Sequence, residues 1–230
     1  MSLRSKHQRA ARLQRLHQTA LRLISTHGIY GWRLHQLAKE LNYTTAALYR
    51  YYPSKELLLE ALQKKSLADM RSSLSKLIAQ SNLTPLGTVL LCTEFYVCYA
   101  RCSPTSFSLN SNILAHPTAI LQGEGRKTLI DLMKELLTLF ATPISQSALS
   151  NRIPVMQKAL CLWSALHGIL LTQKYRGDFP VPQASDLVPS LIIGWGATPS
   201  QIITAQEELS SFLQDTSLSS FASLDVQEPS

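Results

Sequence analysis

Two short helical patterns separated by a tight polar turn occupy residues 34–59, and this stretch constrains the fold more than any other. The first pattern places four apolar residues at i, i+3, i+4 and i+7, which is one face of a helix. Asn42 follows, at a position where a helix often ends on a left-handed residue and Asn substitutes for Gly. Thr44 or Thr45 can then cap a second helix through its hydroxyl. The sequence therefore predicts a helix-turn-helix. The apolar face consists of Leu34, Leu37, Ala38 and Leu41.

The second helix of this motif is predicted over residues 45–51, with small residues on one side and tyrosines on the other. Ala46 and Ala47 allow the backbone of this helix to lie close against a partner. A helix of this kind is typical of the recognition helix that enters a major groove of DNA. We therefore expect the front of this helix to contact DNA.

Basic residues are concentrated in the part of the chain that carries the motif. Residues 1–65 contain 12 Lys and Arg against 3 Glu, a balance of +9, whereas residues 66–230 contain 10 against 12, a balance of −2. This asymmetry indicates that the N-terminal part meets a polyanion and that the C-terminal part does not. A solvated basic face is the alternative interpretation.

A first helix is expected from about residue 5 to residue 27, ending at Gly28. Five basic residues precede it or lie along it, and such an arm can follow phosphates or reach a minor groove. For the first two of them, a frayed terminus is the alternative. The five residues are Arg4, Lys6, Arg9, Arg12 and Arg15.

Composition and length favour an all-α protein with room for a sizeable core. The chain has 230 residues, is 45% hydrophobic and 16% charged, and lacks alternating β-branched runs joined by Asn-Gly or Asp-Gly turns. No apolar run reaches the roughly 18 uncharged residues of a spanning helix, and four Cys do not form a disulfide framework. We therefore expect a cytoplasmic protein.

The start of the next helix carries a further indication of anion binding. Ser54 is suited to cap this helix, and Pro53 ends the preceding one. Lys55 then lies in the first turn, where the helix dipole disfavours a cation. A phosphate at this point would satisfy the backbone N–H groups, the dipole and the ammonium group together. An exposed lysine without a ligand is the alternative.

Residues 16–60 resemble the DNA-binding domain of the TetR family of bacterial transcriptional regulators. The segment L-Y-R-Y-Y-P-S-K, residues 48–55, carries most of the resemblance. At three positions the residue type differs from the one usual in the family. Asn42 stands where the family usually has the turn Gly, and Tyr52 where it usually has Phe. Arg33 stands where Ser or Thr commonly caps the second helix. The positions that match are Ala20, Gly28, Leu37, Ala38, Leu48, Tyr49, Tyr52, Ser54, Lys55 and Leu58.

The resemblance implies a symmetric homodimer that places two recognition helices in successive major grooves of a palindromic operator. Among the residues at the front of the helix, Arg50 alone can make a strong bidentate contact with guanine, while alanine methyls can pack on thymine. Tyr49, Tyr52, Lys55 and Arg33 would position the protein on phosphates. The DNA-binding set is thus Arg33, Thr44, Thr45, Ala46, Ala47, Tyr49, Arg50, Tyr52 and Lys55.

Beyond the motif, helices are predicted over residues 54–80, 86–101, 126–140, 154–175, 187–195 and 199–213. Residues 106–122 are expected to be irregular, with a short helix around 109–116, and residues 141–153 to form a connection. The predicted domains are a DNA-binding domain with a basic arm over 1–60, an effector-binding and dimerisation domain over 61–213, and a disordered tail over 214–230.

The helix over residues 86–101 is apolar on nearly every side and is therefore expected to be buried. It contains Cys92 and Cys98, and Cys102 follows one turn after Cys98. A metal or redox sensor is one interpretation of these residues, and buried free cysteine is the other. No further metal ligand lies within the segment, so no metal site is predicted.

Aromatic and Met side chains on three of these helices are candidates for a ligand pocket. Such side chains also form ordinary cores, and the residues alone leave both possibilities open. The segment W-S-A-L-H-G, residues 163–168, resembles the Trp…His-Gly signature of one group of TetR-family C-terminal domains. His167 is a ligand contact, a general base or a packed histidine. The candidate pocket residues are Phe95, Tyr99, Met133, Leu137, Trp163 and His167.

The two helices over 154–175 and 187–195 are too apolar for solvent on all sides and are expected to pair with those of a second copy. The residues predicted at this interface are Leu162, Leu166, Ile169, Leu170, Leu191, Ile192 and Trp195.

The sequence therefore predicts a dimeric, DNA-binding transcriptional regulator, with repression of an operator relieved by a small apolar or amphipathic effector. The alternative is a DNA-binding protein whose C-terminal domain binds a protein partner. No catalytic constellation supports an enzyme, and neither cofactor nor metal is expected.

Overall fold

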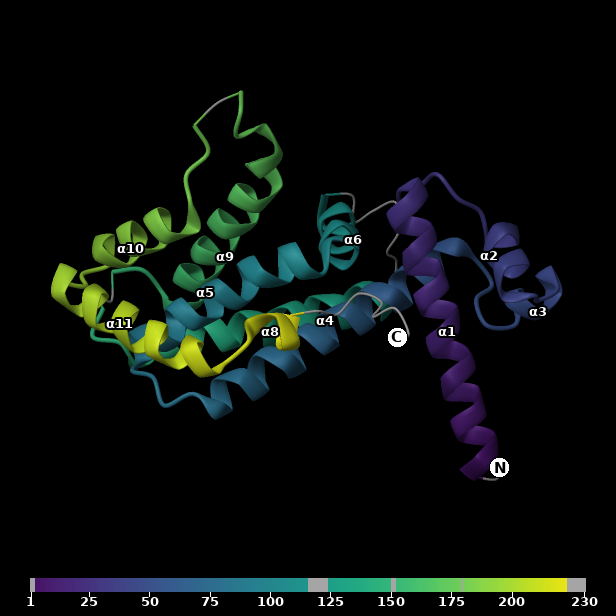
Figure 1. Cartoon of the computed structure of the whole chain (residues 1–230), viewed down its shortest axis with the longest axis horizontal. Helices are drawn as coiled ribbons and strands as arrows, with labels where there is room; N and C mark the ends of the chain where they lie inside the picture. Colours follow the sequence, from purple (N-terminus) through teal and green to yellow (C-terminus); the bar gives the residue numbers. More distant parts are fainter. Residues whose placement is uncertain (1–2, 116–123, 150–151, 179, 223–230) are drawn as a thin grey trace. The chain divides into compact units, whose positions relative to one another are not determined.

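The computed structural model describes residues 3–115, 124–149, 152–178 and 180–222. Within these ranges the chain forms helices and no strand, which confirms the predicted all-α class (Figure 1). The helices are α1 (Leu3–His27), α2 (Leu34–Leu41), α3 (Thr45–Tyr49), α4 (Lys55–Gln80), α5 (Pro85–Cys102), α6 (Pro104–Ala115), α8 (Glu124–Gln146), α9 (Val155–Thr172), the 3-10 helix η1 (Gln173–Tyr175), α10 (Ala184–Gly194), α11 (Pro199–Asp215) and α12 (Leu218–Ala222).

Contacts divide the described chain into two compact units. The first contains residues up to 66 together with those of 103–129, and the second contains 67–102 and 130–222. The helix α4 therefore contributes its first turns to one unit and its remainder to the other. The domain boundaries expected from the sequence, at residues 60 and 213, remain predictions.

The first unit is built on α1, which packs against α2 and α6, while α2 packs against α3. Leucines at the contact surfaces are fully buried and form its core. Because α1 is 25 residues long, its N-terminal turns extend past α2 and α3 (Figure 1). The fully buried leucines are Leu16, Leu37, Leu48 and Leu58.

The second unit is organised around α5, against which α9, α10, α11 and α12 pack. Ten of the 18 residues of α5 are buried, which confirms that this helix is buried on most sides. The apolar character of α5 all round its circumference follows from this central position, since neighbours on several sides exclude water from it.

Several predicted boundaries were wrong. The helix α6 begins at Pro104, directly after α5, because Pro is well suited to the first turn of a helix, where its missing N–H needs no partner. Residues 106–108, predicted to be irregular, are thus helical, and residues 116–122 of the same predicted segment lie outside the described ranges. Likewise, α8 continues past Phe140 to Gln146, with Pro143 inside it.

The C-terminal segment contains a helix that the sequence did not predict. Residues 218–222 form α12, and Ala222 is fully buried, whereas the expectation was a disordered tail from residue 214. This short helix packs against α5, so burial on a neighbouring helix stabilises it rather than helix propensity. The remainder of the predicted tail, residues 223–230, lies outside the described ranges.

One described helical segment, Val155–Tyr175, is long and apolar enough to cross a membrane by length and composition alone. The sequence had predicted no such run. Its two lysines, Lys158 and Lys174, interrupt the apolar stretch without lowering its mean hydropathy far enough to exclude it.

Candidate nucleic-acid interface

The turn between α2 and α3 has the predicted left-handed residue. Asn42 has φ 56° and ψ 39°, and its N–H points back to the carbonyl oxygens of Ala38 and Lys39. The next N–H, of Tyr43, donates to the carbonyl of Ala38 at 2.9 Å. Asn tolerates this conformation better than most residues, and these bonds satisfy the last carbonyls of α2.

The cap of α3 is Thr44, whose hydroxyl accepts a hydrogen bond from the N–H of Ala47 at 3.1 Å. The helix is shorter than predicted, because it ends at Tyr49 rather than at Tyr51. Leu48 is fully buried beneath it and fixes its inner face against the core of the first unit.

The outer face of α3 is open to a ligand the size of DNA. Thr45, Ala46 and Arg50 are exposed, and 47% of Tyr49 is accessible. Four of the predicted contact residues therefore share one exposed surface, while Ala47 is half-buried at its edge. The arrangement presents small side chains, one guanidinium and one phenol, which can read base edges and contact phosphates.

Arg33 precedes α2 and is exposed, as a phosphate contact requires. A guanidinium has no acceptor atom and cannot cap a helix. Instead, Gln36 accepts the N–H of Arg33 through its side-chain oxygen at 2.6 Å. The unusual residue at the start of α2 is thus accommodated by a glutamine one turn later.

Lys55 is held by its own chain in a way that the sequence did not reveal. Its ammonium group donates to the carbonyl oxygen of Trp32 at 2.7 Å and lies 4.5 Å from the centroid of the Trp32 ring. Burial lowers the pKa of Lys55 below its usual value, with the nearby Glu56 acting in the opposite direction. Two of the three ammonium donors remain for a phosphate. Ser54 caps α4 as predicted, accepting from the N–H of Leu57 at 3.2 Å.

Tyr52, predicted to contact phosphate, shares a 2.7 Å hydrogen bond between its hydroxyl and Nε2 of His17. Burial raises the pKa of the Tyr52 hydroxyl above its usual value. The bond joins α1 to the segment between α3 and α4. Sequence reasoning missed His17, because an isolated histidine in an amphipathic helix has no distinguishing spacing.

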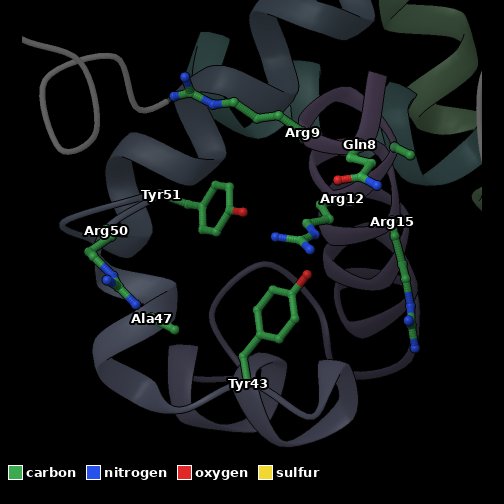
Figure 2. Close-up of a pocket in the computed structure, with 9 residues that line it drawn as sticks. Gln8, Arg9, Arg12, Arg15, Tyr43, Ala47, Arg50 and Tyr51 are labelled. Atoms are coloured by element: carbon green, nitrogen blue, oxygen red, sulfur yellow. The ribbon is translucent and has the colours of Figure 1, made fainter. Parts of the chain in front are cut away.

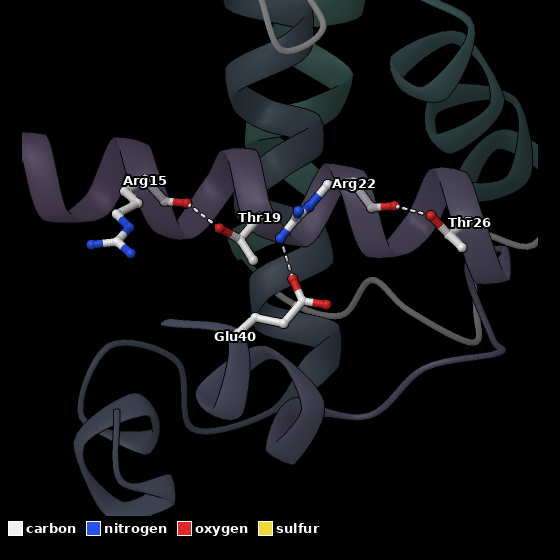
Figure 3. A network of polar contacts seen from close by, with 5 residues as sticks. All are labelled: Arg15, Thr19, Arg22, Thr26 and Glu40. Atoms are coloured by element: carbon white, nitrogen blue, oxygen red, sulfur yellow. Dashed lines mark hydrogen bonds and ion pairs between the residues drawn. The ribbon is translucent and has the colours of Figure 1, made fainter. Parts of the chain in front are cut away.

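A second link, on the protein surface, joins α1 to the helix-turn-helix. Arg22 of α1 forms an ion pair with Glu40 of α2, while Thr19 and Thr26 donate to the carbonyl oxygens one turn before them (Figure 3). Exposed pairs of this kind contribute little to stability, on the order of 0–1 kcal/mol. The pair consumes one guanidinium of α1 that would otherwise be available to an anion.

In the second unit, the structure brings four aromatic side chains of α5 and α9 together. The hydroxyl of Tyr96 and Nδ1 of His167 share a hydrogen bond of 2.7 Å, and the rings of Trp163 and His167 stack with centroids 5.0 Å apart. Tyr96 also lies against Trp163 and Tyr99. Burial lowers the pKa of His167 and raises that of Tyr96. We name Tyr96, Tyr99, Trp163 and His167 the aromatic cluster.

Three of the six predicted pocket residues therefore meet, together with Tyr96, which was not predicted. Phe95 is fully buried in α5. Met133 and Leu137 are half-buried on α8. A cavity of about 340 Å³ in this unit is lined by none of the six, but by residues at the starts of α5 and α11 and at the end of α8.

Of the seven residues predicted at the dimer interface, five are buried within the unit, and Leu170 and Leu191 are half-buried. The buried five offer little surface to a second chain, and the interface itself stays a prediction. A helix that is apolar on all sides gives no periodicity from which the inner face can be chosen. The exposed apolar side chains of the same elements are Met156, Leu160, Leu171, Tyr175 and Ile193. The five buried residues are Leu162, Leu166, Ile169, Ile192 and Trp195.

Cys92 and Cys98 are packed side chains, whereas Cys102 is half-buried and Cys161 is exposed. Burial raises the pKa of Cys92 to about 12, and its thiol donates to the carbonyl of Leu139 at 3.7 Å. The sulfur atoms of Cys98 and Cys102 lie 3.6 Å apart, and burial also raises the pKa of Cys98. The raised pKa values keep the thiols of Cys92 and Cys98 protonated, which disfavours a reactive thiolate at either residue.

Comparisons with known proteins agree with this geometry. Residues 16–62 match the family model described as bacterial regulatory proteins of the tetR family. No curated protein matches the chain by sequence.

Solved structures with the same fold include three regulators. AibR, in complex with isovaleryl coenzyme A and operator DNA, is 20% identical with a TM-score of 0.56 and covers 79% of this chain and 98% of its own. FadR from Bacillus subtilis, in complex with stearoyl-CoA, is 14% identical with a TM-score of 0.55, covering 78% and 95%. PfmR from Thermus thermophilus, a TetR family regulator, is 17% identical with a TM-score of 0.55, covering 77% and 97%.

Proposed function

The chain belongs to the TetR family of bacterial transcriptional regulators, and we propose that it binds a palindromic operator as a homodimer in the cytoplasm and represses transcription until a small molecule releases it. The observation that carries the DNA-binding part is the exposed front of α3. Its capped N-terminus, small residues and single guanidinium meet the needs of a helix that approaches base edges closely.

Within this interface the residues have different roles. Arg50 reads a guanine, whereas Thr44, Thr45, Ala46 and Ala47 allow close approach. Arg33, Tyr49, Tyr52 and Lys55 set the orientation through phosphates. For Tyr52 and Lys55 this role is shared with their contacts inside the protein, to His17 and Trp32.

A dimer is supported by the apolar side chains that α9, η1 and α10 leave exposed. Four of these side chains are each 43–47% accessible, namely Met156, Leu160, Leu171 and Tyr175. Leu160 follows Met156 by four positions, and Tyr175 follows Leu171 by four. A second copy covering this face would remove it from water and account for the apolar length of Val155–Tyr175. Sedimentation velocity of the full chain should give twice the mass of 25.6 kDa.

The effector site that we propose is the aromatic cluster. Its stacked rings and its Tyr96–His167 hydrogen bond offer an apolar surface with one polar group, as small-molecule sites commonly do. Because AibR and FadR were solved with acyl-CoA thioesters, this class of compound is the first to test. Effector binding would favour one of two distances between the DNA-binding domains of the dimer. The coupling free energy between the effector site and the operator site would be roughly 1–3 kcal/mol.

The experiment selects genomic fragments on the purified protein and then measures the affinity of two variants for the selected operator. Arg50→Ala should change base preference at one position and weaken binding by about 1–3 kcal/mol there, roughly 5- to 150-fold. Lys55→Ala should weaken binding to all DNA sequences by the same factor. The DNA-binding proposal is wrong if neither substitution changes binding.

A thermal-shift series with acyl-CoA thioesters tests the effector. A bound effector raises the melting temperature and lowers operator affinity. If no small molecule does so, while a protein co-purifies on the C-terminal unit, the alternative of a partner-binding module is favoured.

A further inference from the structure

The first half of α1 lies outside the segment that matches the family model. The match begins at residue 16, whereas α1 begins at Leu3, so 13 helical residues precede it. At about 1.5 Å per residue they add roughly 20 Å of helix. Arg9, Arg12 and Arg15 lie on this extension at three-residue intervals, spanning about 9 Å along its axis.

These arginines form one side of a groove of about 980 Å³ in the first unit. Tyr43 and Tyr51 line the opposite side, with ring centroids 6.4 Å apart and planes inclined by 15°. Figure 2 shows the guanidinium of Arg12 in the space between the two phenol groups, whose hydroxyls point toward it. Arg50 of the segment after α3 completes the lining, so the groove is continuous with the recognition helix.

The charge of this groove is not balanced by the protein. Four arginines and no carboxylate line it, and none of the four forms an ion pair among the described residues. Further along the same helix, Arg22 is paired with Glu40 (Figure 3). Like charges gathered on one surface repel each other, so an anion bound between them lowers their energy. The groove is therefore built for a polyanion.

We propose that this groove, which we name the arginine groove, holds the phosphodiester backbone of duplex DNA beside the major groove entered by α3. The proposal rests on the DNA-binding function proposed above and extends it to phosphates outside the base pairs that α3 reads. Guanidinium groups bind phosphate oxygens bidentately, and tyrosine hydroxyls add neutral donors. A span of about 9 Å matches two or three successive phosphates at a rise of about 3.4 Å each along one strand.

The test compares the wild type with the triple variant R9Q/R12Q/R15Q on a selected operator. Hydroxyl-radical footprinting should show protection of the flanking nucleotides in the wild type and its loss in the variant, while the core stays protected. The slope of log K against log salt should fall in magnitude by about 0.9 per lost phosphate contact, so by about 1.8–2.7 per subunit for two or three contacts. On a duplex trimmed to the core base pairs, both proteins should bind alike.

Two further variants serve as controls. K134Q/K174Q/R176Q removes the same charge from exposed positions of the second unit and should keep the wild-type footprint and slope. R9K/R12K/R15K keeps the charge and should keep most of the slope. Circular dichroism confirms that each variant is folded.

Three outcomes overturn the proposal. One is an unchanged flanking footprint and slope in R9Q/R12Q/R15Q. Another is an equal loss of core and flanking protection, which assigns the arginines a role in the fold. The third is a melting temperature that inorganic phosphate raises in the wild type and not in the variant, while the two footprints stay alike, which identifies a free anion as the occupant. Absence of any operator for the wild type instead contradicts the DNA-binding function itself.

Discussion

In the described part of each unit, a histidine and a tyrosine share a hydrogen bond of 2.7 Å, and the two bonds have different surroundings. In the first unit, His17 is buried, at 8% exposure, and Tyr52 is half-buried beside the DNA-binding motif. In the second, Tyr96 and His167 meet inside the aromatic cluster, where Trp163 stacks on the histidine. The histidine is thus the more buried partner in the first unit, and the tyrosine is the more buried partner in the second.

This comparison shows where each unit keeps its polar groups. The first unit buries several polar side chains beside its leucines, among them Asn110, whose side-chain amide donates to the hydroxyl of Ser66 at 3.1 Å. The second buries the hydroxyl of Tyr96 against the rings of the aromatic cluster, where its hydrogen bond to the half-buried His167 satisfies it. The effects of substitution should therefore differ between the two units in a measurable way.

The largest effect should come from opening matched cavities in the two cores. Leu48 and Leu162 are both fully buried, with 0% exposure. Leu48→Ala and Leu162→Ala should each lower the free energy of unfolding by about 2–5 kcal/mol, but in different transitions. Chemical denaturation followed by tyrosine and tryptophan fluorescence, together with operator binding, separates them. A single transition shifted equally by both substitutions would show that the two units unfold as one.

The next effect concerns the hydroxyl groups themselves. Tyr96→Phe removes the hydroxyl that bonds Nδ1 of His167 and should cost about 0.5–1.5 kcal/mol, because water can reach the half-buried imidazole. Tyr52→Phe should cost about 1–3 kcal/mol, since the imidazole that loses this partner, that of His17, is buried. Urea denaturation of both variants measures the difference. Equal losses would remove the distinction between the two pairs.

The smallest effect is a dependence on pH that belongs to the second unit. Burial lowers the pKa of His167 below its ordinary 6.5, so the folded chain binds fewer protons than the unfolded chain just below that pH. The free energy of unfolding should therefore fall as pH drops below about 6.5 and gain nothing above it. Denaturation at about pH 7.5 and about pH 5.5 should show a larger loss for the wild type than for His167→Gln. A loss of the same size in both proteins would exclude this origin.

The helix-turn-helix was predictable because its signals are local. The left-handed turn at Asn42 and the caps at Thr44 and Ser54 follow from residue type and spacing, and the structure has all three. The link from Lys55 to Trp32 was not predictable, since it joins residues 23 positions apart and depends on the packing of the unit.

The second unit was less accessible to sequence reasoning for a physical reason. Helices such as α5 and α9 are apolar nearly all round, so their periodicity does not select an inner face. Trp163 and His167 were named because of a signature, but Tyr96, which joins them, stood among other apolar candidates. The inward orientation of Leu162 and Ile192 became visible only from burial.

The continuity of α1 also has a consequence for the entropy of association. A disordered basic arm must be ordered when it meets DNA, at a loss of about 1–2 kcal/mol per residue in backbone freedom. In this chain the segment that carries Arg9, Arg12 and Arg15 is already helical and joined to the motif. The extension is therefore preorganised, and more of the energy of each phosphate contact remains as affinity.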